Sequence, residues 1–375
     1  MNFSCEKALL QNALLNVSRA APTRSNLAAL EGILIEADER LKLTGYNLEV
    51  GISERLDADI TAAGSAVVQA RLLTDIVRRL PDDMVSVSLN DKMVLHITCG
   101  GAEFDIASCL EGGAFPRLPA VEKEKSASLP QKMLREMIHG TIFAVAGDEN
   151  KTVHRGSKFI WEDGCLIVLA LDGYRLALRR EAYEGEAPGE DFVVPGNALR
   201  EVERLLGDGD DDVNMVLGGR HILFEMGGVT LTTRLLEGEF MNYRTTIPGD
   251  QPVSVELNAD ELVAGLERVS LLISEKVKTP VRLTLEEQSI GLSCATALGA
   301  ARDRFPALVS GLEETEQDSA FEIGFNHRYL LDALRALPDH ECVIRMTNPL
   351  SPCVIMPKEG DAFVYMVLPV RLRVE

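Results

Sequence analysis

Arginines recur at matched positions along this sequence, and their side chains could bind phosphate or another anion. Two residues before each of Leu80, Leu206 and Leu337 stands an arginine, and each leucine precedes a turn-forming stretch. A second arginine lies seven residues earlier in the first and third cases and four residues earlier in the second. Because residues at these spacings share one face of a helix, each pair predicts two cations on the same side. The six residues are Arg71, Arg78, Arg200, Arg204, Arg328 and Arg335.

The overall charge argues against a nucleic-acid partner until the placement of the charges is considered. The chain of 375 residues has 38 Lys and Arg against 58 Asp and Glu, a formal net charge of −20. Net charge sums over every surface, so a protein can be acidic outside and basic on one face. Three such helices side by side would contact phosphates without reading bases, and binding would be weak, salt-dependent and indifferent to sequence. The alternative is that these arginines are ordinary exposed residues in surface salt bridges.

The motifs of the common enzyme classes are absent from the sequence. No phosphate-binding loop, dinucleotide fingerprint, zinc-protease motif or serine nucleophile elbow occurs, and the six histidines are dispersed. The seven cysteines form no C-x-x-C pair and no zinc spacing, which favours reduced thiols used as small core residues. The acidic stretch at residues 207–212 lacks the closing glutamate of a calcium loop. We therefore expect no catalytic residue, no metal and no cofactor.

Nothing in the sequence indicates a membrane partner. No apolar run approaches the roughly 20 residues that span a bilayer. The first 15 residues carry an acid and a base within their apolar pattern and have no small-residue cleavage site, so they fit an amphipathic helix better than a signal peptide. We expect a cytoplasmic protein.

The arginines must be positioned by a pattern of elements that the sequence repeats three times, with a period of about 125 residues. Each third opens with an amphipathic helix whose apolar residues recur at i, i+4 and i+7; in the middle copy these are Leu134, Ile138 and Thr141. Alternating strands follow, then a second helix that carries the arginines, then further strands. The expected first helices are residues 6–20, 131–145 and 259–273, and the second helices are residues 70–83, 196–210 and 326–340.

This pattern predicts an α+β fold of three repeated domains, each with two helices packed on antiparallel sheets. A charged, small-residue linker at residues 122–128 and a Pro/Gly-rich linker at residues 248–252 mark the boundaries. The expected domains are residues 1–122, 127–249 and 252–375. The alternative is a single large α/β domain in which helices and strands alternate by coincidence.

Four segments resemble signatures of the bacterial sliding clamp family, the beta subunit of the replicative DNA polymerase III. DGYRLA at residues 172–177 is similar to the family's T-D-G-H-R-L-A, and RLLEGEFMNYR at 234–244 to its R-L-I-E-G-x-F-P-x-Y-R. IGFNHRYLLDAL at 323–334 is similar to I-G-F-N-x-x-Y-L-L-D-A-L, and LPVRL at 368–372 to the ending M-P-M-R-L. The similarity runs over the whole chain, and the three repeats match the family's three domains.

The resemblance implies a non-catalytic processivity factor. Three clamp domains in each chain would form a six-domain ring as a head-to-tail homodimer, with helices lining the hole around double-stranded DNA. The implied partners are the polymerase III catalytic subunit, the clamp-loader ATPase complex, and other polymerases and repair proteins that carry a clamp-binding peptide. Arg24 joins the six repeated arginines in the expected DNA-contacting set.

The resemblance also implies a peptide pocket between the second and third domains. Tyr174 and Met241 replace a common His and Pro there, and Leu368 and Val370 replace two methionines, so the peptide preference is open. Leu176, Tyr329 and Leu372 could instead be ordinary core residues. The expected lining is His154, Leu171, Gly173, Tyr174, Arg175, Leu176, Met241, Asn326, Tyr329, Leu350, Pro352, Met366, Leu368, Pro369, Val370, Arg371 and Leu372.

For the dimer contact, the resemblance places Phe104 and Ile106 of one copy against Leu271 and Leu272 of the other. Two functions of other classes compete with the clamp. One is an acidic scaffold that binds only proteins. The other is an enzyme that uses the turn at residues 172–175 as a phosphate or carboxylate site. Residues 373–375 extend past the family's usual end, and the sequence assigns them no role.

Overall fold

The computed structural model forms two compact units. Unit 1 consists of residues 1–132, 185–188 and 201–235, and unit 2 of residues 133–184, 189–200 and 236–375. The expected three copies therefore do not correspond one to one with the units, because the middle copy contributes to both. The residues that the structure describes are 1–107, 109–122, 125–147, 152–209, 211–274, 279–314 and 321–372; the C-terminal extension at 373–375 lies outside them.

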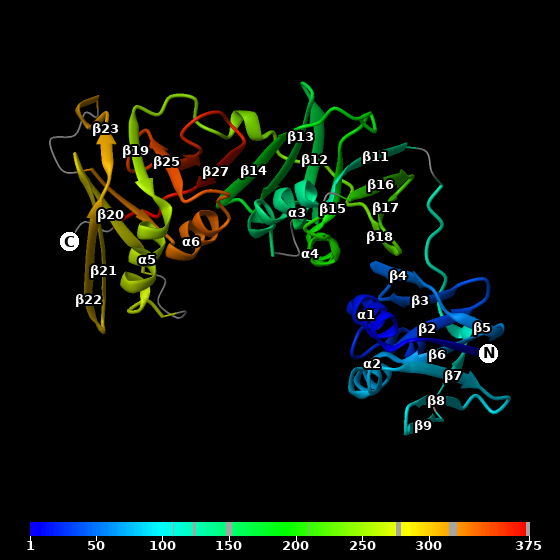
Figure 1. The fold of residues 1–375 in the computed structure, drawn as a ribbon. Coiled ribbons are helices and arrows are strands. Elements are labelled where there is room, and N and C mark those ends of the chain that lie inside the picture. The colour runs from blue at the N-terminus through cyan, green and yellow to red at the C-terminus, as the bar shows by residue number, and fades with distance from the viewer. Residues whose placement is uncertain are drawn as a thin grey trace. The chain divides into compact units, whose positions relative to one another are not determined.

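Unit 1 contains two antiparallel sheets (Figure 1). The five-stranded sheet has the order β5 (Asp59–Ala62), β1 (Asn2–Glu6), β7 (Met84–Leu89), β8 (Leu95–Cys99) and β9 (Ala102–Ile106). The nine-stranded sheet has the order β10 (Leu110–Glu111), β6 (Gly64–Gln69), β2 (Gly32–Ala37), β3 (Leu41–Tyr46), β4 (Val50–Leu56), β18 (Val229–Arg234), β17 (His221–Met226), β16 (Asp212–Gly218) and β11 (Lys125–Pro130).

Unit 2 also contains two antiparallel sheets. The nine-stranded sheet has the order β15 (Phe192–Pro195), β12 (Gly156–Glu162), β13 (Cys165–Leu171), β14 (Arg175–Ala182), β27 (Phe363–Val367), β26 (Cys353–Met356), β25 (Glu341–Met346), β19 (Val253–Asn258) and β23 (Leu308–Ser310). The four-stranded sheet has the order β22 (Gly299–Pro306), β21 (Ser289–Thr296), β20 (Val281–Glu286) and β24 (Phe321–Phe325).

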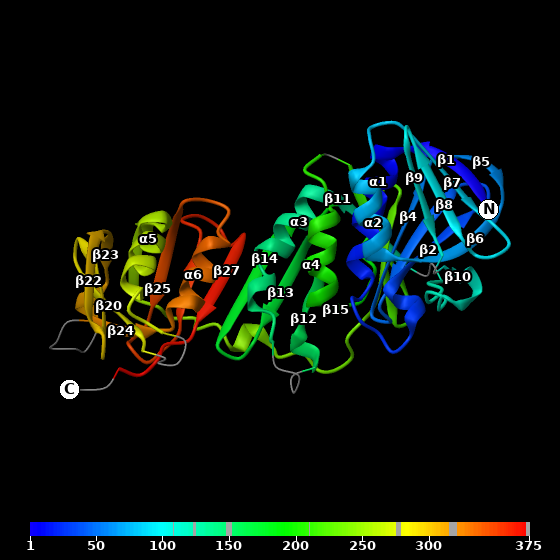
Figure 2. The ribbon, with the colours of Figure 1, turned by 90° about the horizontal axis from the view of Figure 1, so that it is seen from below.

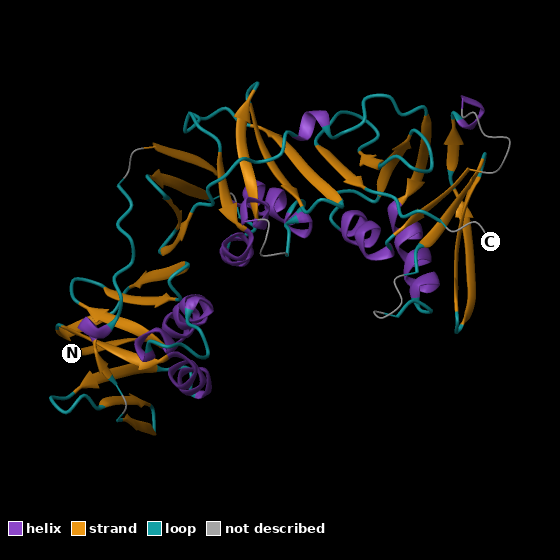
Figure 3. Cartoon of the chain, turned by 180° about the vertical axis from the view of Figure 1, so that it is seen from behind, coloured by secondary structure: helices purple, strands orange, loops and turns teal. Residues whose placement is uncertain are grey.

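The α-helices are those that the repeat predicted: α1 (Lys7–Val17), α2 (Ala70–Arg79), α3 (Gln131–His139), α4 (Gly196–Leu205), α5 (Ala259–Ser270) and α6 (His327–Arg335). In unit 1 α1 packs on α2, and in unit 2 α5 packs on α6, so each pair forms a layer beside its sheets (Figures 2 and 3). The buried stripe of α5 is Leu262, Leu266 and Val269, as its i, i+4, i+7 pattern predicts. Asn258 and Asn326 cap α5 and α6 by accepting backbone N–H bonds.

Two expectations about the first helices were wrong. Each third opens with a strand, not a helix, because β1, β11 and β19 precede α1, α3 and α5. Helix α3 also ends at His139, so Thr141 follows the helix; its hydroxyl donates to the carbonyl of Met137 at 2.8 Å. Gly140, the residue after the helix, lies at a close approach to its neighbours, since a Cβ there would be 2.8 Å from Cγ of Arg179.

Sheet pairing joins strands that are far apart in the sequence. In unit 1, β4 pairs with β18 and Ile52 lies opposite Leu231. In unit 2, β14 pairs with β27, and Leu176 lies opposite Met366 (Figure 1). The second junction brings the end of the chain beside the turn at residues 172–175, which is where the sequence placed the peptide pocket.

Candidate functional site

The turn between β13 and β14 is fixed by one carboxylate and one glycine. Oδ1 of Asp172 accepts hydrogen bonds from the backbone N–H of Tyr174 at 2.9 Å and of Arg175 at 3.1 Å. Gly173 has φ of 91°, a conformation that favours glycine. The turn therefore presents Tyr174 outward, with a residue exposure of 59%.

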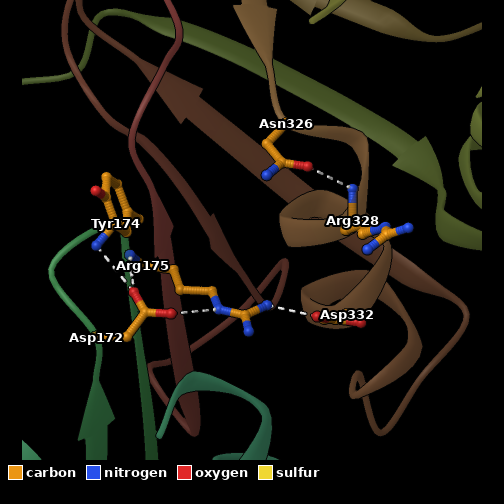
Figure 4. Close-up of polar contacts among 6 residues, drawn as sticks. All are labelled: Asp172, Tyr174, Arg175, Asn326, Arg328 and Asp332. Atoms are coloured by element: carbon orange, nitrogen blue, oxygen red, sulfur yellow. Dashed lines mark hydrogen bonds and ion pairs between the residues drawn. The ribbon is translucent and has the colours of Figure 1, made fainter. Parts of the chain in front are cut away.

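Arg175 turns inward and ties this hairpin to α6 (Figure 4). Its Nε donates to Oδ2 of Asp172 at 3.1 Å and its Nη1 to Oδ2 of Asp332 at 2.5 Å. The guanidinium also lies over the rings of Tyr329, at 4.6 Å from the centroid, and Phe143, at 5.5 Å. Because two carboxylates already occupy this cation, the turn offers little to a substrate anion, which counts against the enzyme alternative.

Tyr174 stacks on Tyr329 from α6. The ring centroids are 5.9 Å apart and the planes are inclined by 24°. Burial raises the pKa of the Tyr329 phenol, and the nearby Asp172 carboxylate raises it further. Tyr329 therefore stays a neutral ring that supports Tyr174 from below. Asn326, one turn earlier, caps α6 by accepting the backbone N–H of Arg328 at 3.1 Å.

The C-terminal segment, residues 368–372, is held between this turn and β24. The backbone N–H of Leu368 donates to the carbonyl of Tyr174 at 2.9 Å, and that of Val370 donates to the carbonyl of Gly324 at 2.8 Å. A Cβ at Gly324 would lie 2.6 Å from the carbonyl oxygen of Val370 and 2.7 Å from Cδ2 of Leu372. The last strand, β27, ends at Val367, before this segment. Pro369 has no N–H to continue a ladder.

An apolar cluster lies against the nine-stranded sheet of unit 2. Leu171, Leu176 and Met366 are each at least 96% buried in it, so these three expected pocket residues form its floor. Phe240 and Tyr243 pack against this floor from the segment after β18, and burial raises the pKa of Tyr243. His154 meets the ring of Phe240 edge-on at a centroid distance of 5.1 Å.

Several large apolar side chains remain at the surface around this floor. Besides Tyr174, they are Met241, Leu350 and Val370, with exposures of 47%, 68% and 39%. A cavity of about 370 Å³ opens beside the C-terminal segment and is lined by Glu322, Gly324, Pro349, Leu350, Val370, Arg371 and Leu372. Pro352 lies half-buried just before β26. Exposed apolar groups around a built cavity are typical of a binding surface.

The sequence did not reveal the residues that hold this site together. Asp332 lies within the family motif at residues 323–334, but no local pattern indicates its tertiary contact with Arg175, and Phe143 lies in none of the quoted motifs. Gly324 could have been found: it lies within the family motif at residues 323–334, where a glycine in a strand marks a close approach of the backbone.

The repeated arginines are exposed, and most have an acidic neighbour. On α2, Oδ1 of Asp75 lies 2.8 Å from Nη2 of Arg78, and Oδ2 of Asp75 lies 3.9 Å from Nε of Arg71. Nη1 of Arg79, an arginine outside the expected set, lies 3.7 Å from Oδ1 of the same carboxylate. Three cations thus share one carboxylate.

The other expected arginines lie on α4, on α6 and in a loop. On α4, Nη1 of Arg204 lies 2.5 Å from Oε1 of Glu201. Nη2 of Arg335 on α6 lies 2.5 Å from Oε1 of Glu267 on α5. Arg24, Arg200 and Arg328 are exposed. Exposed ion pairs are weak, so such arginines can exchange a carboxylate for a phosphate.

The four expected dimer-contact residues lie at two separate places. Phe104 is 38% exposed on β9, the edge strand of its sheet, while Ile106 is buried. Leu271 and Leu272 follow α5, and Leu271 is 83% exposed. An exposed leucine and an exposed phenylalanine next to sheet edges fit a protein contact.

The described residues contain no cluster of three or more His, Cys, Asp or Glu arranged to hold a metal. Burial raises the thiol pKa of six cysteines, to about 12 for Cys5, Cys342 and Cys353, so these thiols are poor nucleophiles. Within the same part of the chain, every helix is too short or too polar to cross a bilayer.

Comparison with known proteins matches the chain along its length. Models of the DNA polymerase III beta subunit match in order: the N-terminal domain at residues 1–119, the central domain at 128–242 and the C-terminal domain at 244–371. The beta sliding clamp of Synechococcus elongatus is 31% identical over 384 residues, which cover 100% of both chains.

Solved structures agree with this match. The crystal structure of the DNA polymerase sliding clamp from Bacillus subtilis is similar with a TM-score of 0.92 and 27% identity, covering 100% of both chains. The sliding clamp (DNA polymerase III subunit beta) from Pseudomonas aeruginosa, solved bound to griselimycin, has a TM-score of 0.91 and 27% identity, covering 99% of this chain and 100% of that chain.

Proposed function

This chain belongs to the DNA polymerase III beta subunit family, the bacterial sliding clamps, and from that membership we propose how its parts carry out the clamp function. It is built of clamp domains and serves as the processivity clamp of DNA polymerase III. In the proposal it catalyses no reaction and acts in the cytoplasm, where the bacterial polymerase works. The domains extend over residues 1–122, 127–249 and 252–375.

Polymerases dock at the surface formed by the turn at residues 172–175, the start of α6 and the C-terminal segment. The observation that carries this assignment is the convergence of three separate pieces of chain on one apolar floor. Tyr174, stacked on Tyr329, and the segment bonded to Gly324 form its walls. Exposed Met241 and Leu350 are available to a ligand without any rearrangement of the core.

The chemistry of this surface suits an exchangeable partner. A docking peptide that buries two or three large apolar side chains gains roughly 1.5–3 kcal/mol from each. After the costs of ordering the peptide, that corresponds to an affinity on the order of micromolar, about −8 kcal/mol. The partners in this proposal are the polymerase III catalytic subunit, the clamp-loader complex, and other polymerases and repair proteins with an apolar docking peptide.

Double-stranded DNA meets the helices. Arginines on α2, α4 and α6 supply cations that contact phosphates, and phosphate contacts carry no base-sequence information. Exposed pairs such as Arg78 with Asp75 are weak in water, and phosphates can replace their carboxylates. Binding is therefore salt-dependent and indifferent to sequence, which allows a ring to slide. A second copy of the chain completes the ring as a homodimer.

Removal of residues 369–375 tests the docking assignment. The shortened chain loses the Val370 contact to Gly324 and the wall beside Leu350. Binding of a peptide from the polymerase III catalytic subunit, measured by fluorescence anisotropy, is expected to be abolished, whereas the dimer and its encirclement of DNA are preserved. Unchanged peptide affinity in the shortened chain would place the docking surface elsewhere.

A further inference from the structure

The first strand of each third of the chain has one edge that faces away from its main sheet neighbour. In the first third, β5 covers this edge and pairs with residues 2–4 of β1. In the last third, β23 covers it and pairs with residues 254–256 of β19. In the middle third, β11 ends its sheet in the described chain, with β16 on one side only (Figure 1). Counted back from the first residue of the following helix, residues 126–128 are equivalent to the two covered stretches.

The segment that would cover β11 lacks the residues of a strand. β5 lies between β4 and β6 in the sequence, and β23 lies between β22 and β24, so the equivalent segment of the middle third joins β14 to β15. This connection, YEGEAPGED at residues 183–191, has two glycines, a proline and no β-branched side chain. Pro188 has no N–H to donate to a ladder, and Gly189 has φ of 80°, outside the range of a strand. The connection therefore leaves the edge of β11 open.

The backbone groups of Ser126 and Ser128 point to this open edge. The backbone N–H of Gln131 donates to the carbonyl of Asp211 at 2.9 Å, which continues the ladder between β11 and β16. In such a ladder, residues that bond to the neighbouring strand alternate with residues whose N–H and C=O point the other way. Counted back from Gln131, the outward positions are Pro130, Ser128 and Ser126, and the proline needs no partner there. In the described chain no hydrogen bond reaches the backbone groups of the two serines.

A cavity of about 500 Å³ lies beside this edge. Ser126 lies opposite Val216 on β16, and Ser128 lies opposite Asn214, so the four side chains share one face of the sheet. Val216 is 1% exposed and supplies an apolar contact at the base of the cavity. An added strand would therefore find room for side chains on this face as well as backbone partners at the edge. The lining residues are Lys125, Ser126, Glu186, Ala187, Pro188, Asn214 and Val216.

The charged groups around the cavity are mostly acidic. Glu186 lines it directly. Oδ2 of Asp212 accepts a hydrogen bond from a serine hydroxyl of β11 at 3.1 Å, and Oε2 of Glu225 accepts one from the Asn214 amide at 2.9 Å. Lys125 is the basic residue of the lining. Three carboxylates against one ammonium group favour a basic ligand.

The two covered edges indicate which side chains a covering strand needs. In β5, Ile60 lies opposite Phe3, and in β23, Val309 lies opposite Val255. Each of these covering residues is apolar, and its partner belongs to the buried core. The equivalent position on β11 is Ala127, which is 2% exposed. A covering strand therefore needs an apolar residue opposite Ala127, and its two neighbours then face the acidic side of the sheet.

We propose that the open edge of β11 is a second docking site, at which an extended segment of a partner protein with alternating basic and apolar side chains pairs antiparallel with residues 126–128. The backbone of this segment completes the ladder as β5 and β23 do in the other two thirds. Its basic side chains face the carboxylates around the cavity. A second copy of β11 fits less well, because it would bring the carboxylates of two cavities together. The site is separate from the docking surface at residues 172–175 and does not depend on the ring.

Binding of a synthetic peptide to the full chain tests this proposal. The probe is a fluorescein-labelled peptide of alternating lysine and valine, about six residues long like an ordinary strand. A peptide of alternating glutamate and valine is the charge control. Fluorescence anisotropy should show that the acidic peptide binds about tenfold more weakly or less. Hydrogen exchange measured by mass spectrometry should slow, on binding of the basic probe, in the peptic fragment that contains residues 126–128.

Substitutions at the edge separate backbone pairing from general attraction to an acidic protein. Ser126→Pro removes an outward N–H without breaking a bond to β16, and the affinity of the basic probe should fall by about tenfold or more. Ser126→Ala is the matched control, because it keeps the N–H, and its affinity should stay within about twofold of the parent's. Glu186→Lys should weaken the basic probe and strengthen the acidic one. Circular dichroism checks that each variant is folded; should the proline variant not fold, Glu186→Lys and the hydrogen exchange of the parent still decide.

Four outcomes overturn the proposal. They are no binding of the basic probe at about 1 mM, equal affinity for the acidic and basic probes, equal affinity in Ser126→Pro and Ser126→Ala, and unchanged hydrogen exchange at residues 126–128. A species larger than the dimer in light scattering, lost in Ser126→Pro, would make a second copy the occupant and also overturn it. Removal of residues 369–375 should leave this binding unchanged, so failure of this site and failure of the docking surface at residues 172–175 are distinguishable.

Discussion

Nη1 of Arg175 lies 2.5 Å from Oδ2 of Asp332, a contact between residues 157 positions apart that joins the hairpin of β13 and β14 to α6. The Arg175 side chain is 12% exposed and that of Asp332 is 39% exposed, so the pair is only partly screened by water. Arg175 also supports the ring of Tyr329, on which Tyr174 stacks. This one side chain therefore connects the stability of unit 2 with the geometry of the docking surface.

Replacement of Arg175 by Met is expected to lower the free energy of unfolding by about 1–3 kcal/mol, because two carboxylates lose their partner. Asp332→Asn should cost less, since Asp172 still holds the guanidinium. Chemical denaturation of the single and double variants measures the coupling. Strictly additive effects would show that the pair contributes nothing.

Gly324→Ala should weaken peptide docking with little effect on the fold. The new Cβ would lie 2.6 Å from the carbonyl oxygen of Val370 and would push the C-terminal segment away from β24. We expect peptide affinity to fall by about tenfold or more, which corresponds to 1.4 kcal/mol. Gly291→Ala on β21 is a matched control, because a Cβ there meets Thr284 only at 3.7 Å. Equal peptide affinity in the two variants would contradict the proposed role of the segment.

The sequence predicted the six α-helices of the described chain and the α+β class, because each helix has an apolar period and the second helix of each third ends at strong turn chemistry. It missed the strands β1, β11 and β19 in front of the first helices. In β1, for example, Phe3 and Cys5 alternate over only five residues and run directly into the helical pattern. The pairing of β4 with β18 and of β14 with β27 was also out of reach, since a local pattern does not specify a distant partner.

The site was predictable to the extent that it lies in contiguous motifs. The turn at residues 172–175 and the segment at 368–372 were placed in the pocket from their resemblance, and the structure brings them together through the bond from Leu368 to Tyr174. Their roles stay predictions. What the sequence could not show is the division between floor and wall: Leu176 and Met366 are buried, whereas Leu350 and Val370 are exposed. That division depends on which strand pairs with which.

Reversal of Arg78, Arg204 and Arg335 to Glu should weaken retention on DNA while the dimer stays intact. If each arginine contacts one phosphate, the negative slope of log association constant against log salt concentration should become less steep by about 3 for each protomer that contacts the DNA. Arg40, Arg244 and Arg282, which are also paired with acids but lie outside the α-helices, form the matched control triple. A helix triple that behaves like the control triple at every salt concentration would make these arginines ordinary surface residues.

His327 at the start of α6 should contribute to acid destabilisation. Burial, and then Arg328, lower its pKa below the ordinary 6.5. Below about pH 6.5 the unfolded chain therefore binds more protons than the folded chain, and the free energy of unfolding falls as pH falls. His327→Gln removes the contribution of this imidazole to the pH dependence. The free energy of unfolding of the variant should therefore fall less than that of the parent between about pH 7 and about pH 5. Parallel unfolding curves for the two proteins across this range would contradict the assignment.

Topological retention on circular DNA distinguishes a ring that encircles the duplex from a protein that only binds phosphates. The clamp is loaded onto nicked circular DNA by its clamp loader and separated from free protein by gel filtration, and the DNA is then cut once. The protein is expected to stay with the intact circle and to be released after linearisation, because a ring slides off free ends and phosphate contacts alone do not hold it. Equal retention on circular and linear DNA, or no retention on either, would contradict the proposed encirclement.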